Sequence, residues 1–464
     1  MASLTDSEPE LAMALRRLEP KTSYAELFAE RTHGHRVNVD RQTTTPRPEP
    51  TLAGVAVRAW DGQRWVEACT SGLQAASVAA AVDAVARRLS SAALSQGPPG
   101  PSATGRGEAT TVEKRPVADF GLEERIEWAT TRRDRVLGFE GIANCFVNVA
   151  TYHEERLFLN TAGARAHQRT VRVLGNLTAI ATEGGKVDFD YAWAGGCGGV
   201  ELLDRMTDES LDTTAKEAVA LLKAHAAPSG TMNVVLDPSL TGTFAHESFG
   251  HGTEADQIVR KRSYLGPLLG TQVGPECLTL VDNGAYPGAW GSIAFDEEGW
   301  PARRNVLIDK GRFVEVLHDR ESAALLHRHP TGNVRRADFL SRPFVRMTNT
   351  YVEPGDRSLE ELLEETRDGV LLQSFTSGIE DPLGGNMQLK SKKGRRIEHG
   401  ELTELYPSMA LSGKVLEFLQ HIRGVSGPED FGLTPGFCGK GHSDLLVTGA
   451  GGPYLASRAI VGPA

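Results

Sequence analysis

The order of apolar and polar residues predicts a mixed architecture for the first half of the chain, residues 1–230. Apolar positions recur three to four residues apart, as on one face of a helix, at residues 10–19, 74–89, 121–137 and 213–225. Between these stretches, alternating or apolar-rich runs predict strands, at residues 36–40, 55–60, 64–69, 144–152, 155–160, 168–174, 177–182 and 186–193. Helices interleaved with strands favour an α+β fold, here a two-layer α/β domain with a curved antiparallel sheet.

Short local signals add detail to the first half. Asp61 and Gly62 stand between two alternating runs, which predicts a tight hairpin turn. The stretch Ser23-Tyr-Ala-Glu26 has the spacing of a capping box, which predicts a second short helix after residue 23. Residues 95–118 are rich in proline and glycine and are expected to form an exposed, mobile loop. Pro228-Ser-Gly230 ends the last helix and marks the expected domain boundary.

Residues 231–464 show a different pattern, in which strand-like runs are separated by tight turns. These runs lie at 232–236, 277–282, 290–295, 303–309, 312–317, 344–353, 369–377, 385–392 and 401–405. Helices are predicted at residues 319–327, 358–367 and 410–422. Gly449-Ala-Gly-Gly-Pro453 is interpreted as a turn, because it lacks the Lys-Ser/Thr ending of a phosphate loop. The second half is therefore predicted to be a β-rich, barrel-like domain.

The composition excludes several classes of protein. It is 40% hydrophobic and 24% charged, which is ordinary for a globular protein. The net charge of −10 argues against a nucleic-acid partner or an anionic membrane surface. The chain has no run of about 18 apolar residues and no signal-peptide core at its acidic N-terminus, so no membrane span and a cytoplasmic location are expected. Five widely spaced cysteines, an odd number, argue against a disulfide framework.

The candidate chemistry is concentrated in His246-Glu247-Ser-Phe-Gly-His251, on a helix that should start at Pro238. Two imidazoles that bind a metal and a carboxylate that accepts a proton from water are the parts of a zinc hydrolase. The histidines are five residues apart, however, which places them about 140° apart on an ideal α-helix. Either the two histidines do not bind the same metal ion, or a π-turn across residues 248–250 brings them onto one face of the helix. Gly250 would make that distortion easier.

A catalytic zinc needs a third protein ligand besides two histidines. Glu254 lies three residues after His251 and is one candidate. Cys438 is the other, in the glycine-rich stretch Pro435-Gly-Phe-Cys438-Gly-Lys-Gly-His442, which is expected to be a loop. Spacing alone does not choose between the two, and a buried free thiol is the simpler interpretation of Cys438 taken by itself.

These residues resemble the TldD/PmbA family, on the TldD side, which carries an HExxxH metallopeptidase motif. Besides residues 246–251, four segments carry the resemblance: Ala294-Phe-Asp-Glu-Glu-Gly299, Val316-Leu-His-Asp-Arg320, Arg346-Met-Thr-Asn-Thr-Tyr351 and Phe437-Cys-Gly-Lys440. The resemblance implies His246, His251 and Cys438 as ligands of Zn²⁺, with Glu247 as the general base. The spacing of the histidines is then the family's own, and Glu254 is left to support a ligand.

The resemblance also implies a function, that of a zinc metallopeptidase that hydrolyses short or unfolded peptides inside a dimeric clamp. A bound zinc would activate water, and Glu247 would accept the proton and pass it to the leaving amine. The peptide would bind by strand addition, and a precursor to be matured is one such substrate. The partner would be a second copy of the chain or a TldE/PmbA-like subunit that lacks the zinc motif. The alternative is a non-catalytic peptide-binding or regulatory protein of the same family.

Overall fold

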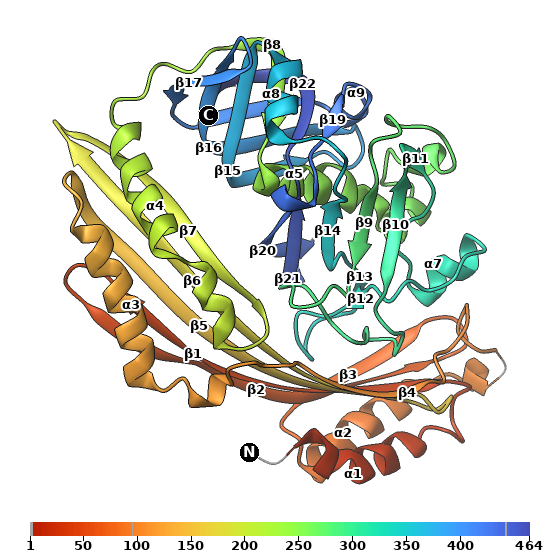
Figure 1. Cartoon of the computed structure of the whole chain (residues 1–464). Coiled ribbons are helices and arrows are strands. Elements are labelled where there is room, and N and C mark those ends of the chain that lie inside the picture. The colour runs from red at the N-terminus through yellow and green to blue at the C-terminus, as the bar shows by residue number, and fades with distance from the viewer. Residues whose placement is uncertain (1–2, 95, 441–442) are drawn as a thin grey trace.

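The computed structural model describes residues 3–94, 96–440 and 443–464. Figure 1 shows a long curved sheet built by the first half of the chain and a β-rich second half that lies over the concave side of this sheet. Among the described helices, none is long and apolar enough to cross a membrane.

Seven strands form the curved sheet, in the order β3-β2-β1-β5-β6-β4, with β7 also paired to β6. All neighbours are antiparallel except β4 and β6. The strands are β1 (Ala25–Val39), β2 (Thr44–Trp60), β3 (Trp65–Ser71), β4 (Arg106–Thr110), β5 (Ile142–Asn160), β6 (Arg165–Glu183) and β7 (Lys186–Cys197).

The helices of the first half cover one face of the curved sheet. They are α1 (Leu4–Arg16), α2 (Ala75–Ala86), α3 (Leu122–Leu137) and α4 (Asp208–Leu221). Side chains alternate between the two faces of a strand, so Leu27 and Ala29 of β1 pack in the core under α1 and α2. Phe28, between them, points to the opposite face and packs against Phe339 of the second half. The predicted two-layer arrangement with a curved antiparallel sheet is therefore confirmed.

Buried ion pairs join the two halves of the chain at the face of the curved sheet that is opposite to its helices. Arg156 of β5 lies 3.0 Å from Glu30 of β1 and 2.5 Å from Glu297 of the second half. Arg58 of β2 lies 3.2 Å from Glu298. The segment 294–299, which contributes to the family resemblance, thus serves this interface.

Five strands of the second half close into a barrel. Their order is β15-β8-β22-β18-β16, and β16 pairs with β15 again. The strands of this sheet are β8 (Gly230–Leu236), β15 (Gly369–Glu380), β16 (Asn386–Glu398), β17 (Glu401–Tyr406), β18 (Met409–Lys414), β19 (Gly424–Val425) and β22 (Leu455–Pro463). Val234, Leu236 and Leu372 are among the fully buried side chains of the core that includes the barrel interior. The predicted barrel-like second half is confirmed.

A second sheet lies beside the barrel, in the order β11-β10-β9-β14-β21-β20, so that β20 is an edge strand. Its strands are β9 (Leu280–Asn283), β10 (Arg304–Asp309), β11 (Arg312–Phe313), β14 (Asn349–Val352), β20 (Gly432–Lys440) and β21 (Ser443–Gly452); β12 (Val334–Arg335) pairs with β13 (Phe344–Val345). The helices here are α5 (Pro238–Thr243), α6 (Ala255–Val259), α7 (Arg320–Leu325), α8 (Leu359–Thr366) and α9 (Val415–Gln420).

Several local predictions are wrong, and in each the tertiary pairing outweighs the local signal. The capping-box stretch at Ser23 starts no helix, because β1 begins at Ala25 and pairs along its length with both β2 and β5. Residues 410–422 are divided between strand β18 and helix α9, and residues 290–295 are not a strand. The loop expected at residues 95–118 contains β4. The stretch 449–453, interpreted as a turn, includes the end of β21.

Gly242 lets α5 lie directly on the backbone of β21. A Cβ atom at this position would be 2.2 Å from the nitrogen of Gly451 and 2.5 Å from the carbonyl carbon of Ala450. Backbone cannot move aside as a flexible side chain can, so Gly242→Ala is expected to lower the stability by about 1–3 kcal/mol despite the better helix propensity of alanine. Thermal unfolding measures this, with Gly105→Ala as the control because its Cβ would have no neighbour within 4 Å. Equal melting temperatures for the two variants would contradict the prediction.

Candidate metal centre

The helix that carries the two histidines changes type just before the first of them. It begins at Pro238, where the side chain of Asp237 accepts a hydrogen bond from the N–H of Leu240 at 2.9 Å. From Phe244 to Gly250 it is a π-helix, and the N–H of His251 donates to the carbonyl of His246, five residues earlier. This bond brings the two histidines onto one side of the helix, with their ring centroids 5.1 Å apart and the rings nearly perpendicular, so the predicted π-turn is confirmed.

Aromatic packing holds the widened helix in place. Phe244 and Phe249 are fully buried. Phe244 lies 4.6 Å from Phe418 of α9, and Phe249 lies 5.2 Å from Phe313 of β11, measured between ring centroids. The irregular backbone is therefore fixed from both sides by the core of the second half.

The structure brings His246, His251 and Cys438 together. One donor atom from each lies within 4.8 Å of the other two. The Sγ atom of Cys438 is 3.2 Å from Nε2 of His251, although the two residues are 187 positions apart in the sequence. Cys438 is on strand β20 rather than in the expected loop, and Gly441 and His442 of that stretch lie outside the described residues.

The donor set suits zinc. Tetrahedral zinc with nitrogen and sulfur ligands at roughly 2.0–2.3 Å has neighbouring donors about 3.5 Å apart, close to the observed Sγ–Nε2 distance. Burial raises the pKa of the Cys438 thiol, but the two histidines more than offset this and lower the pKa to about 4. A thiolate at neutral pH is the form that binds a metal. The three residues therefore fit a zinc ion with a fourth position left for water or substrate.

Glu254 does not join the donor atoms but supports one of them. Its Oε2 atom is 3.5 Å from Nδ1 of His251, on the opposite side of the ring from Cys438. Lys440 lies 2.9 Å from Glu254, and Arg346 lies 3.6 Å away. Burial raises the pKa of Glu254, but these cations and His251 lower it to about 2. A permanently charged carboxylate behind the imidazole fixes the ring and increases its basicity.

Glu247 lies at the rim of the cluster. Its Oε2 atom is 3.8 Å from Nε2 of His251, and its side chain is 25% exposed. Strand β15 lies close to the Glu247 side chain. A Cβ atom at Gly378 of this strand would be only 2.7 Å from Cγ of Glu247. Glu247 is thus near the donor atoms and also open to a substrate from solvent.

The sequence did not single out three other residues near the cluster. Arg346 donates to the carbonyl of Cys438 at 2.6 Å, and Lys440 bonds the carbonyl of Val345 at 3.0 Å, so both tie β20 to the site. Both were inside segments that carry the family resemblance, which was the available signal. Glu380 at the end of β15 had no such signal. Burial raises the pKa of Glu380 to about 8. The charge of His251 lowers this pKa, and the charge of Glu247 raises it further.

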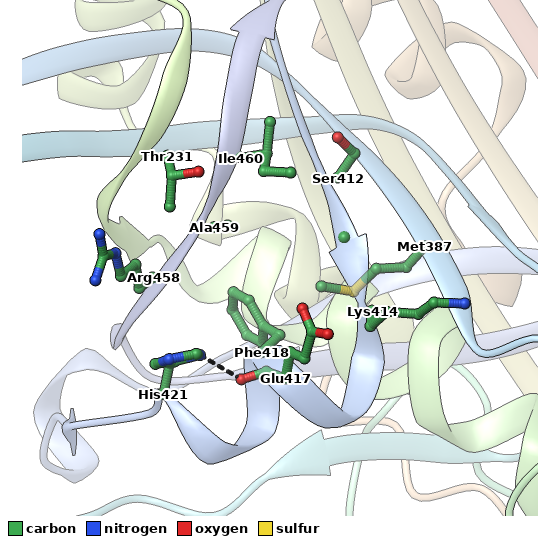
Figure 2. Close-up of a pocket in the computed structure, with 11 residues that line it drawn as sticks. Thr231, Met387, Ser412, Lys414, Glu417, Phe418, His421, Arg458, Ala459 and Ile460 are labelled. Carbon is green, nitrogen blue, oxygen red and sulfur yellow. Dashed lines mark hydrogen bonds between the residues drawn. The ribbon is translucent and has the colours of Figure 1, made fainter.

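Another hollow, of about 230 Å³, lies on the barrel between β18, β22 and α9 (Figure 2). Phe418 and Met387 form its apolar side, and His421 is bonded to the carbonyl of Glu417 at 2.6 Å. Among the described residues that line it, none belongs to the His-His-Cys cluster. This hollow is therefore separate from the candidate metal centre.

Replacement of Glu254 by glutamine is expected to weaken zinc binding about 10–100-fold. A neutral amide would neither balance Lys440 and Arg346 nor hold the imidazole of His251 as a charged acceptor does. Competition with a chromogenic chelator measures the affinity. Glu401→Gln, at an exposed position of β17, controls for the loss of one negative charge. Equal zinc affinity in the two variants would show that Glu254 does not support the ligand.

Comparison with known protein families gives two matches. Residues 115–225 match the family described as PmbA/TldA metallopeptidase central domain, and residues 229–460 match the PmbA/TldA metallopeptidase C-terminal domain.

Individual relatives agree with these matches. A protein of Methanothermobacter thermautotrophicus named metalloprotease is 38% identical over 350 residues, which are 75% of this chain and 76% of that protein. A zinc metalloprotease TldD homolog of Saccharolobus solfataricus is 33% identical over 53% of this chain and 55% of its own length.

Solved structures share the whole fold at low sequence identity. A Thermotoga maritima protein described as a candidate modulator of a DNA gyrase has a TM-score of 0.79 at 20% identity, over 98% of this chain and 99% of that one. TldE of Thermococcus kodakarensis has a TM-score of 0.72 at 18% identity, over 98% of this chain and 100% of that one.

Proposed function

The chain belongs to the PmbA/TldD family of metallopeptidases, and we propose that it is a zinc-dependent peptidase that hydrolyses short or unfolded peptides. The observation that carries this proposal is the convergence of two imidazoles and a thiolate within 4.8 Å, with the carboxylate of Glu247 beside them. The name of the Saccharolobus relative supports zinc as the metal.

The residues of the site have separate roles in the proposed hydrolysis. His246, His251 and Cys438 would hold zinc, which supplies a Lewis acid that polarises a carbonyl and makes water more acidic. Glu247 accepts a proton from the attacking water and returns it to the leaving amine. Glu254 keeps His251 oriented throughout.

Strand β20 offers a way to bind peptides by their main chain. It carries Cys438, and among the described strands it is paired only with β21, so one edge is free for a peptide to add as a further strand. A cavity of about 560 Å³ lies along its first residues and is lined by Trp193, Tyr286, Trp290 and Phe431. A peptide added there would run along β20 toward the metal centre. Recognition through the main chain favours unfolded peptides, because folded proteins do not present a free strand.

We further propose that the working form is a dimer that encloses this edge, with either a second copy or a TldE/PmbA-like subunit that lacks the zinc motif. A peptide precursor to be trimmed is one substrate that fits such an enclosed site. Sedimentation of the chain alone and with a candidate partner subunit measures the assembly. A catalytically active monomer would contradict the clamp.

The central experiment measures zinc and cleavage on the same sample. The purified chain is expected to contain about one zinc and to cleave casein-derived peptides but not a folded protein of similar composition. A chelator should stop cleavage, and added zinc should restore it. If the zinc-loaded chain binds peptides and leaves them intact, in every assembly tested, the chain is a peptide-binding or regulatory protein instead.

A further inference from the structure

Glu380 is a buried carboxyl close to the metal centre that the reaction described above does not use. It ends β15, two residues after Gly378, the residue that touches Glu247. Residues two apart on a strand point to the same face. Ile379, between them, is 65% exposed and points the other way. The side chain of Glu380 therefore enters on the same side of the strand as Glu247.

The carboxyl group of Glu380 has no partner within the described chain. Both of its oxygen atoms are buried and accept no hydrogen bond there. The hydroxyl of Tyr264 interacts electrostatically with Glu380, but it donates its hydrogen bond to the carbonyl of Ser248 at 3.0 Å. A buried carboxylate without donors is strongly unfavourable, so this position fits a group that arrives from outside the chain.

The surrounding charges leave Glu380 uncompensated. Lys440 and Arg346 are already engaged by Glu254, and Lys440 also bonds Asp256 at 2.7 Å. The two positive charges of a divalent metal would be balanced by the negative charges of the Cys438 thiolate and the Glu247 carboxylate. Lys440 and Arg346 are therefore not free to balance the negative charge that Glu380 carries when it is ionised, beside a site that is open to substrate.

We propose that Glu380 binds a positively charged group of the peptide, an ammonium or a guanidinium, next to the bond that is cleaved. The inference rests on the proposed peptidase function and adds a substrate class, peptides that are cationic near the scissile bond. The positive group has two sources, the free amino terminus of the peptide or a lysine or arginine side chain. The first would make the chain act as an aminopeptidase, and the second would give it a basic side-chain preference.

Peptide binding to a chain that does not cleave tests this inference apart from catalysis. The zinc-loaded Glu247→Gln variant is titrated with hexapeptides of alanine, glycine and leucine that carry a C-terminal fluorophore. One peptide has a free amino terminus, one is acetylated, and a series is acetylated with a single lysine placed at each position in turn. Fluorescence anisotropy gives the dissociation constants. The same titrations are repeated with Glu380→Gln added, and with Glu401→Gln added as the control for charge.

The acetylated peptide without lysine is expected to bind at least about 10-fold more weakly than one of the cationic peptides, because a charge-assisted hydrogen bond is lost. Glu380→Gln should remove this difference, and Glu401→Gln should keep it. A response to acetylation alone identifies the amino terminus, and a response to lysine at one position identifies a side chain. The inference is overturned if all peptides bind equally, if none binds, or if Glu380→Gln keeps the preference or loses the zinc. Failure of the parent chain to cleave peptides that it binds would overturn the peptidase function alone.

Discussion

Glu247→Gln is expected to abolish peptide cleavage while leaving zinc bound. Glutamine keeps the size of the side chain but cannot accept a proton from water, and general acid–base catalysis contributes about 10²–10⁴-fold to the rate. His246, His251 and Cys438 are untouched by the change, so the zinc content should stay near one per chain. Steady-state cleavage of a fluorogenic peptide, with metal analysis of the same sample, measures both quantities.

The control is Glu401→Gln, which removes a charge from an exposed position and should cleave at the parental rate. If Glu247→Gln retains kcat/KM within about tenfold of the parent, Glu247 contributes less than general-base catalysis normally does. Glu380 would then be the first carboxyl to test in its place, because its charge and that of Glu247 act on each other.

The spacing of the two histidines was the most informative feature of the sequence. Metal ligands five positions apart do not fit one face of an α-helix, so binding of one metal by both histidines required a local π-turn, and the structure contains a π-helix from Phe244 to Gly250. The chemistry required both histidines at one metal, and a regular α-helix would have kept them apart, so the two requirements together predicted a widened helix. The hydrogen bond from the N–H of His251 to the carbonyl of His246 shows that the helix is widened there, as binding of one metal by both histidines requires.

The location of the cysteine could not be derived in the same way. Gly436 and Gly439, which flank the pair Phe437-Cys438, lower the local preference for a strand, and the expected structure was a loop. The strand exists because β21 pairs with it, with Cys438 opposite Leu446. Long-range pairing also explains the error at Ser23, where a local capping signal was outweighed by β1. Glu380 had no sequence signal, because only the approach of β15 to the π-helix gives it a role.

Cys438→Ser is expected to lose zinc and, with it, the stability that zinc adds. Serine is nearly the same size, but its neutral hydroxyl is a poor zinc ligand, whereas the thiolate of Cys438 is stabilised by both histidines. A ligand that binds only the folded chain stabilises it by about 2.7 kcal/mol at a free concentration of 100 times its Kd. The parent chain should therefore melt at a lower temperature after chelation. The Cys438→Ser variant should show no such shift and contain no zinc.

The matched control is Cys277→Ser, because Cys277 is an exposed free cysteine outside the cluster. It should keep the zinc and the full thermal shift, which excludes a general effect of losing a thiol. Cys438→Ser also separates the two candidate third ligands. If it keeps one zinc per chain and melts as the parent does, the thiolate is not a ligand. Glu254 would then have to turn from Lys440 and Arg346 toward the metal, which would leave the buried Arg346 without its carboxylate and Lys440 with Asp256 alone. That cost is the physical reason to expect the cysteine to hold the metal.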